Sequence, residues 1–112
     1  MTIFFGFGIA DGMFSPEVLT SRKPLTPEEA RDLIPNCEVC LNPSHAATIT
    51  AMNQRYHIKC EIPEKAPIVS LKAGDQFLVM SPRGLPRLEN RHEYTSEEIE
   101  KASFVFGLWT IL

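Results

Sequence analysis

Three stretches of the chain are apolar almost throughout, and polar or turn-forming residues bound each of them. They are residues 2–9 (TIFFGFGI), 77–81 (FLVMS) and 103–112 (SFVFGLWTIL). Short, continuous apolar runs of this kind are typical of strands that are buried on both faces. The pattern therefore predicts three buried strands, and the glycines of the first, Gly6 and Gly8, permit close backbone approach there.

Two capping boxes mark the starts of helices. Thr26 is followed by Pro27 and then by Glu29, and Thr95 is followed by Glu98. In a capping box, the threonine and glutamate side chains each accept a hydrogen bond from a backbone N–H group in the first turn, and proline is favoured at the first helical position. We therefore predict one helix that starts at Thr26 and ends at the next proline, and another that starts at Thr95.

The segment 42–57 (NPSHAATITAMNQRYH) predicts a further helix, from His45 to about Tyr56, with Ser44 as its N-cap. Apolar residues recur at helical spacing after His45, which places this histidine at the rim of an apolar stripe. The entrance of a helix carries unpaired N–H groups and can bind an anion. Two interpretations stay open: the imidazole packs at the rim, or it faces a phosphate and delivers a proton to a leaving oxygen.

The remaining segments complete the predicted fold. Residues 37–42 indicate a strand, 58–63 and 66–72 indicate short edge-like strands, and 82–94 form a polar loop. The chain is then one α/β domain over residues 1–112, with a mixed β-sheet of about five strands and helices packed on it. Because the final strand is apolar on both faces, a second subunit is a natural cover, and we expect a homodimer.

The composition, with 44% hydrophobic and 22% charged residues, is that of an ordinary globular protein. No apolar run approaches the ~20 residues that a membrane span requires. The N-terminal stretch lacks the basic region and the cleavage site of a signal peptide. The three cysteines are an odd number, which suits reduced thiols better than a disulfide framework. We therefore expect a cytoplasmic protein without membrane association.

The net charge of −3 and the isoelectric point near 5.6 argue against duplex nucleic acid as a partner, because duplex binders usually carry a basic face. Any contact with a nucleotide must come from a few placed side chains and backbone amides. Arg83, Arg87 and Arg91 lie close together in the polar loop and can each bind a phosphate bidentately. The alternative is a solvated loop whose charge Glu89 and Glu93 balance.

A second candidate site uses sulfur. Cys37 and Cys40 form a C-x-x-C pair, and His57 and Cys60 form an H-x-x-C pair at a spacing that zinc sites tolerate. However, cysteines three apart on a strand point to opposite faces, and the residues between them do not favour the turn of a zinc knuckle. Buried, reduced cysteines are therefore the preferred interpretation, and we predict no metal site.

From residue 44 onward the chain carries an ordered set of motifs: SHAAT, LKAGDQFLVM, RGLPRLENR and TSEEIEKASFVFGLWTIL. They supply a histidine at a helix start with a threonine nearby, a strand, a loop with arginine and Leu-Pro, and a closing helix and strand. This order resembles the viral ring nuclease family, small type III anti-CRISPR proteins of archaeal viruses and phages. The opening stretch IFFGFGIADGMF is similar to the first strand of that family, whereas residues 15–43 do not align with it.

The resemblance implies a homodimer with a shared cleft and a cyclic oligoadenylate as ligand. It implies metal-independent cleavage without a cofactor, in which a ribose 2′-hydroxyl attacks the neighbouring phosphate and His45 acts as general acid. It also implies the residues that contact the ligand, which are Gly8, Ser44, Arg83 or Arg87, and Glu89.

Two further hypotheses stay open. Phe7 and Ala10 stand where the family tends to have asparagine and serine, so polar contacts to the ligand are lost. Such losses favour a non-catalytic sponge that binds the cyclic nucleotide in the same cleft, because each hydrogen bond removed from a buried ligand weakens binding by about 1–3 kcal/mol. The third hypothesis is a structural or DNA-interacting accessory protein in which His45 only packs.

Overall fold

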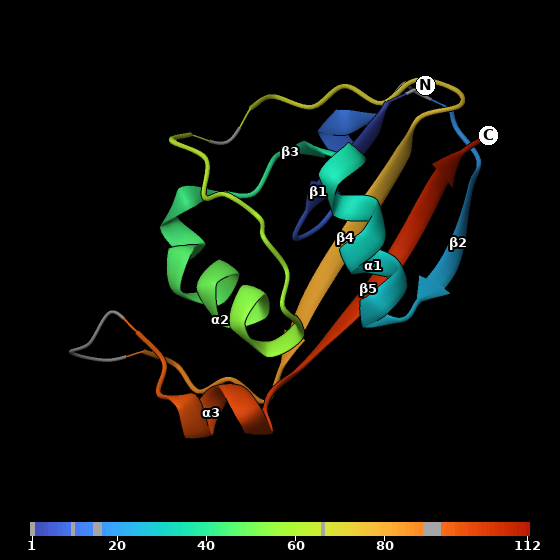
Figure 1. Cartoon of the computed structure of the whole chain (residues 1–112). Coiled ribbons are helices and arrows are strands. Elements are labelled where there is room, and N and C mark those ends of the chain that lie inside the picture. The colour runs from blue at the N-terminus through green and yellow to red at the C-terminus, as the bar shows by residue number, and fades with distance from the viewer. Residues whose placement is uncertain (1, 10, 15–16, 66, 89–92) are drawn as a thin grey trace.

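The computed structural model describes residues 2–9, 11–14, 17–65, 67–88 and 93–112. Its centre is a five-stranded mixed sheet with the order β2-β5-β4-β1-β3 (Figure 1). Strand β1 runs parallel to β3 and β4, and β5 runs antiparallel to β4 and β2. The predicted α/β class and the sheet of about five strands are therefore confirmed. The strands are β1 (Ile3–Gly6), β2 (Thr20–Leu25), β3 (Glu38–Val39), β4 (Gln76–Arg83) and β5 (Ser103–Ile111).

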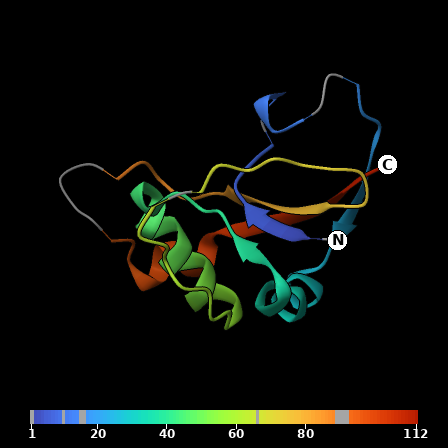
Figure 2. The ribbon, with the colours of Figure 1, turned by 90° about the horizontal axis from the view of Figure 1, so that it is seen from above.

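Helices cover one face of this sheet (Figure 2). Both predicted capping boxes are present: Thr26 Oγ1 accepts from the N–H of Glu29 at 3.2 Å, and Thr95 Oγ1 accepts from the N–H of Glu98 at 3.2 Å. None of the helices in the described part of the chain is long and apolar enough to cross a membrane. The helical elements are η1 (Asp11–Met13), α1 (Pro27–Leu33), η2 (Ile34–Asn36), η3 (Pro43–His45), α2 (Ala46–Tyr56) and α3 (Ser96–Lys101).

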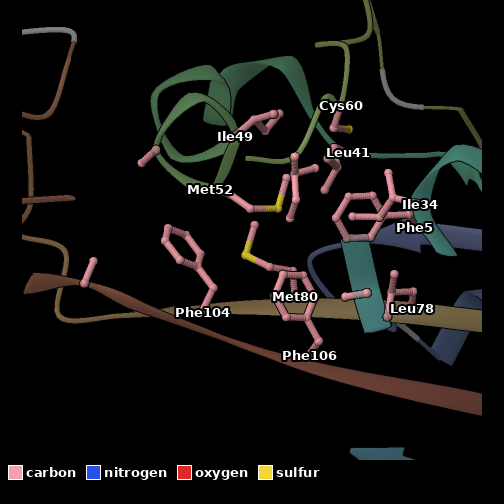
Figure 3. Packing of buried hydrophobic residues seen from close by; sticks show 14 of the residues in the cluster. Phe5, Ile34, Leu41, Ile49, Met52, Cys60, Leu78, Met80, Phe104 and Phe106 are labelled. Atoms are coloured by element: carbon pink, nitrogen blue, oxygen red, sulfur yellow. The ribbon is translucent and has the colours of Figure 1, made fainter. Parts of the chain in front are cut away.

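The main core lies between the sheet and helices α1 and α2. Met52 of α2 points toward Met80 of β4, and Phe5 and Phe106 fill the space beside them (Figure 3). Tyr56 closes the far end of α2, where its hydroxyl accepts a hydrogen bond of 3.0 Å from the N–H at the start of β5. These contacts fix the direction of α2 and hence the place where its first turn meets the sheet.

A smaller core lies on the opposite face, where no helix longer than the single turn η1 covers the described sheet (Figure 2). The chain after α2 crosses back to this face, and the N–H of Leu71 donates to the carbonyl of Met13 at 2.7 Å. The strands predicted at 58–63 and 66–72 are wrong, because their described residues form no strand. Side-chain hydrogen bonds replace ladder bonds here: the Asn53 amide binds both the N–H and the carbonyl of Cys60.

Strand β2 was not predicted from the sequence. It is the exposed edge strand TSRKPL, which pairs only with β5 and contains Pro24. Proline and charged side chains are tolerated at a sheet edge, where they prevent pairing with other chains. The segment therefore lacks the apolar pattern that identifies the buried strands.

We predict that Gly6→Ala destabilises the fold. A Cβ at this position would lie 2.9 Å from Phe77 Cζ and 3.0 Å from Cys40 Sγ, and Phe77 is fully buried. Overpacking of this kind costs about 1–3 kcal/mol. The free energy of unfolding, measured in urea, should fall by that amount.

Gly107→Ala is the matched control. There the three atoms nearest to the added Cβ all belong to the guanidinium of Arg22, and the closest is Nε at 2.7 Å. Arg22 is exposed and its long side chain can rotate away, so we expect a change within about 0.5 kcal/mol. Equal losses in the two variants would contradict this packing.

We also predict a pH-dependent effect at Asp75, a buried carboxylate that ties the N-terminus to the turn before β4. It accepts 2.9 and 3.1 Å hydrogen bonds from the N–H groups of Lys72 and Thr2. The Lys72 bond first, and then the Thr2 bond, hold the pKa of Asp75 below its usual range, against the opposing effect of burial. At pH 7, Asp75→Asn should lower the free energy of unfolding by about 1–3 kcal/mol.

The sign of the pH dependence follows from the lowered pKa. The stability that the Asp75 carboxylate contributes is complete above its unfolded pKa of about 3.9 and is lost as the pH falls through the lower folded pKa. The difference between wild type and Asp75→Asn in urea unfolding should therefore narrow when the pH is lowered from 7 to 3. A difference that stays constant would show that the ionised carboxylate is not the stabilising group.

Candidate functional site

The candidate site lies at the carboxyl ends of the parallel strands. Phe7 and Gly8 follow β1 directly, and the chain leaving β3 passes through the turn η3 into α2. In α/β sheets, ligands bind outside the carboxyl ends of parallel strands. Gly8, Ser44 and His45 are all exposed to solvent at this edge.

His45 occupies the N-cap position of α2, and its side chain makes no capping hydrogen bond. The imidazole packs edge-to-face against Phe7, with ring centroids 5.0 Å apart and an interplanar angle of 83°. Contacts between aromatic rings in this geometry are favourable and restrict the orientation of both rings. One part of the imidazole is therefore held by Phe7, while the residue as a whole remains open to solvent.

The predicted capping role of Ser44 is wrong. Asn42 caps this entrance: its Oδ1 accepts from the N–H of Ser44 at 2.9 Å, and its carbonyl accepts from the N–H of His45 at 3.0 Å. An asparagine followed by Pro43 favours this turn, because its side chain mimics a backbone acceptor and proline is pre-set for the first helical position. The N–H of Ala46 donates to Pro43 as well. The backbone N–H groups of residues 44–46 therefore already have partners within the chain, so the predicted set of unpaired N–H groups is not found at these residues.

Within one chain, the polar loop does not bring Arg83 close to His45. Arg83 ends β4 and pairs with Ser103 of β5. The next residue of β5, Phe104, donates its N–H to the hydroxyl of Tyr56, which lies in the last turn of α2. Because an 11-residue helix is about 16 Å long, Arg83 lies far from the entrance at His45. Arg87 is exposed in the loop, and Glu89 lies outside the described residues, as do Arg91 and His92.

A hollow of about 220 Å³ opens beside the entrance and was not predicted from the sequence. It begins at Ala46 and Ala47, the two residues that follow His45, and continues along α2 to Gln54. Glu93 and Tyr94, which precede α3, form its other wall. In the sequence the alanines indicated only helix propensity, and nothing local showed which segment would face them.

The three cysteines are free and partly or fully buried. Burial raises the pKa of Cys37, Cys40 and Cys60 to about 11, so the thiols are protonated at neutral pH. Cys37 packs with the main core and Cys40 with the core on the opposite face, as their spacing predicted. Across the described ranges, no three His, Cys, Asp or Glu side chains lie close enough together to hold a metal ion.

The arrangement of strands and helices is that of a viral protein of known structure. This protein is B116 of Sulfolobus turreted icosahedral virus (STIV), to which the chain is similar with a TM-score of 0.68. The match covers 98% of this chain and 99% of B116, at 17% sequence identity, and thus shows a common fold. No protein-family model matches the chain, and no curated protein matches it either.

Proposed function

We propose that this chain binds a cyclic oligonucleotide of the cyclic oligoadenylate type and cleaves it without a metal ion. The observation that carries this proposal is the solvent-exposed imidazole of His45, oriented by Phe7 at the carboxyl edge of the parallel strands. The choice of ligand rests on the resemblance of the motifs after residue 44 to those of the ring nuclease family, and the match with B116 adds only that the fold occurs in a viral protein.

In the proposed reaction, a ribose 2′-hydroxyl of the ligand attacks the adjacent phosphorus. A bond forms between O2′ and phosphorus, the bond from phosphorus to O5′ breaks, and the proton of the 2′-hydroxyl passes to solvent. The His45 imidazolium gives its proton to the departing O5′ and then takes another from water. The products are a 2′,3′-cyclic phosphate and a free 5′-hydroxyl.

A homodimer completes the proposal. Arg83 is remote from His45 in the same chain, so a second copy would bring the arginines that hold the phosphates. The face of the sheet away from the helices suits such an interface. Val105 is 40% exposed there, and Ile9, Phe14, Val79 and Trp109 line an apolar hollow of about 330 Å³.

A second candidate function is sequestration without cleavage. It is favoured by Phe7, which places an apolar ring, and not a hydrogen-bonding group, beside the imidazole. In that case the same cleft would bind the cyclic oligonucleotide and release it intact.

Incubation with cyclic di-, tri-, tetra- and hexa-adenylate in EDTA, followed by chromatography, tests both functions. The proposal predicts linear products that end in a 2′,3′-cyclic phosphate. Depletion of free ligand that is recovered intact after denaturation would instead identify a sponge. No interaction with any of the rings would overturn both.

A further inference from the structure

The hollow beside His45 has a composition that suits one flat, polar-edged ligand. Its base is apolar and shallow, because the α2 residues there are the small Ala46, Ala47 and Ala51. Ile99 of α3 adds a buried apolar side chain, and Tyr94 contributes an aromatic ring. Apolar side chains and aromatic rings of this kind pack against the faces of nucleobases.

Polar groups stand on both sides of this apolar base. Thr50 and Gln54 lie on the α2 side, and Glu93 lies on the opposite wall. A glutamine amide can bind the N6 and N7 edge of adenine with two hydrogen bonds, and a glutamate accepts from an exocyclic amino group. The volume of about 220 Å³ lies below that of drug-sized sites and fits a single base.

We infer that this hollow is a nucleobase-binding site with a preference for adenine. Its position one residue after His45 would hold a base of the ligand while a phosphate of the same ligand lies at the imidazole. The inference deepens the proposed function and in that sense rests on it. The recognition of adenine, however, can be tested without any cleavage.

The direct probe is 5′-AMP, followed by NMR through the backbone amide signals of the protein. Saturable shifts should be confined to α2 residues 46–54 and to residues 93–94, and they should also occur in His45→Ala. Replacement of AMP by 5′-IMP exchanges the exocyclic amino group for a carbonyl. IMP should then bind at least about tenfold more weakly, because the glutamate and the oxygen of the glutamine amide lose the amino group from which they accept hydrogen bonds.

Ala47→Leu fills the hollow with a side chain of high helix propensity, so it should preserve the fold and weaken AMP binding at least tenfold. Glu100→Leu, an exposed position in α3 outside the hollow, is the matched control and should bind AMP as the wild type does. Circular dichroism verifies that both variants are folded.

The possible outcomes separate this inference from the proposed function. AMP binding in the hollow without cleavage of any cyclic ring would uphold the base site and overturn the nuclease. Cleavage that Ala47→Leu leaves unchanged would uphold the nuclease and overturn the base site. AMP shifts located elsewhere, or equal binding of AMP and IMP, would also overturn the base site.

Discussion

His45→Ala should lower the rate of cyclic oligoadenylate cleavage by about 10²–10⁴-fold, the contribution that a positioned general acid makes. The proposed mechanism needs a proton at O5′ as the P–O5′ bond breaks, and alanine cannot supply it. His45 is exposed and makes no capping hydrogen bond, so its loss should change the free energy of unfolding by no more than about 0.5 kcal/mol. Single-turnover cleavage with the protein in excess measures the chemical step.

His57→Ala provides the control. His57 is also exposed and lies at the opposite end of the same helix, as the C-cap of α2. Its removal tests whether any surface histidine matters, and we expect cleavage at the wild-type rate. Binding of cyclic tetra-adenylate should persist in His45→Ala. Cleavage at the wild-type rate in His45→Ala would show that His45 is not the general acid. Loss of ligand binding alone would instead assign His45 to ligand recognition.

The sequence predicts the fold best where local chemistry and burial agree. Capping at Thr26 and Thr95 depends on residues within one turn, so it could be read directly. The apolar runs that became β1, β4 and β5 lie in the sheet and supply buried core residues such as Phe5, Phe77 and Phe106. The edge strand β2 and the coil after α2 could not be predicted in this way. Their structure depends on contacts with segments far away in the chain, and not on the pattern of their own residues.

The candidate site was predictable in its position but not in its contacts. The sequence alone placed His45 at a helix entrance, which the structure bears out. It could not show that Asn42 and not Ser44 caps the turn, since both residue types are good caps and backbone geometry chooses between them. The contact of Phe7 with His45, and the hollow that lies between α2 and Tyr94, join segments far apart in the chain.

Phe5→Ala should cause the largest loss of stability. Phe5 is fully buried at the centre of β1, where its neighbours in register are Val39 of β3 and Leu78 of β4. Truncation of a buried phenylalanine costs about 3–5 kcal/mol, because both apolar burial and packing are lost. That is a large part of the 5–15 kcal/mol typical of a domain, and the Tm should fall by about 10–20 °C.

Ile68→Ala is the control for this prediction. Ile68 is fully exposed, at 101%, so the same kind of truncation should change the free energy of unfolding by less than about 0.5 kcal/mol. Urea unfolding of both variants gives the comparison. Because β1 leads directly to Phe7, which orients His45, Phe5→Ala should also weaken cleavage at temperatures where the protein is still mostly folded. A loss below about 1 kcal/mol in Phe5→Ala would mean that β1 does not anchor the core, and the position of Phe7 would then need another explanation.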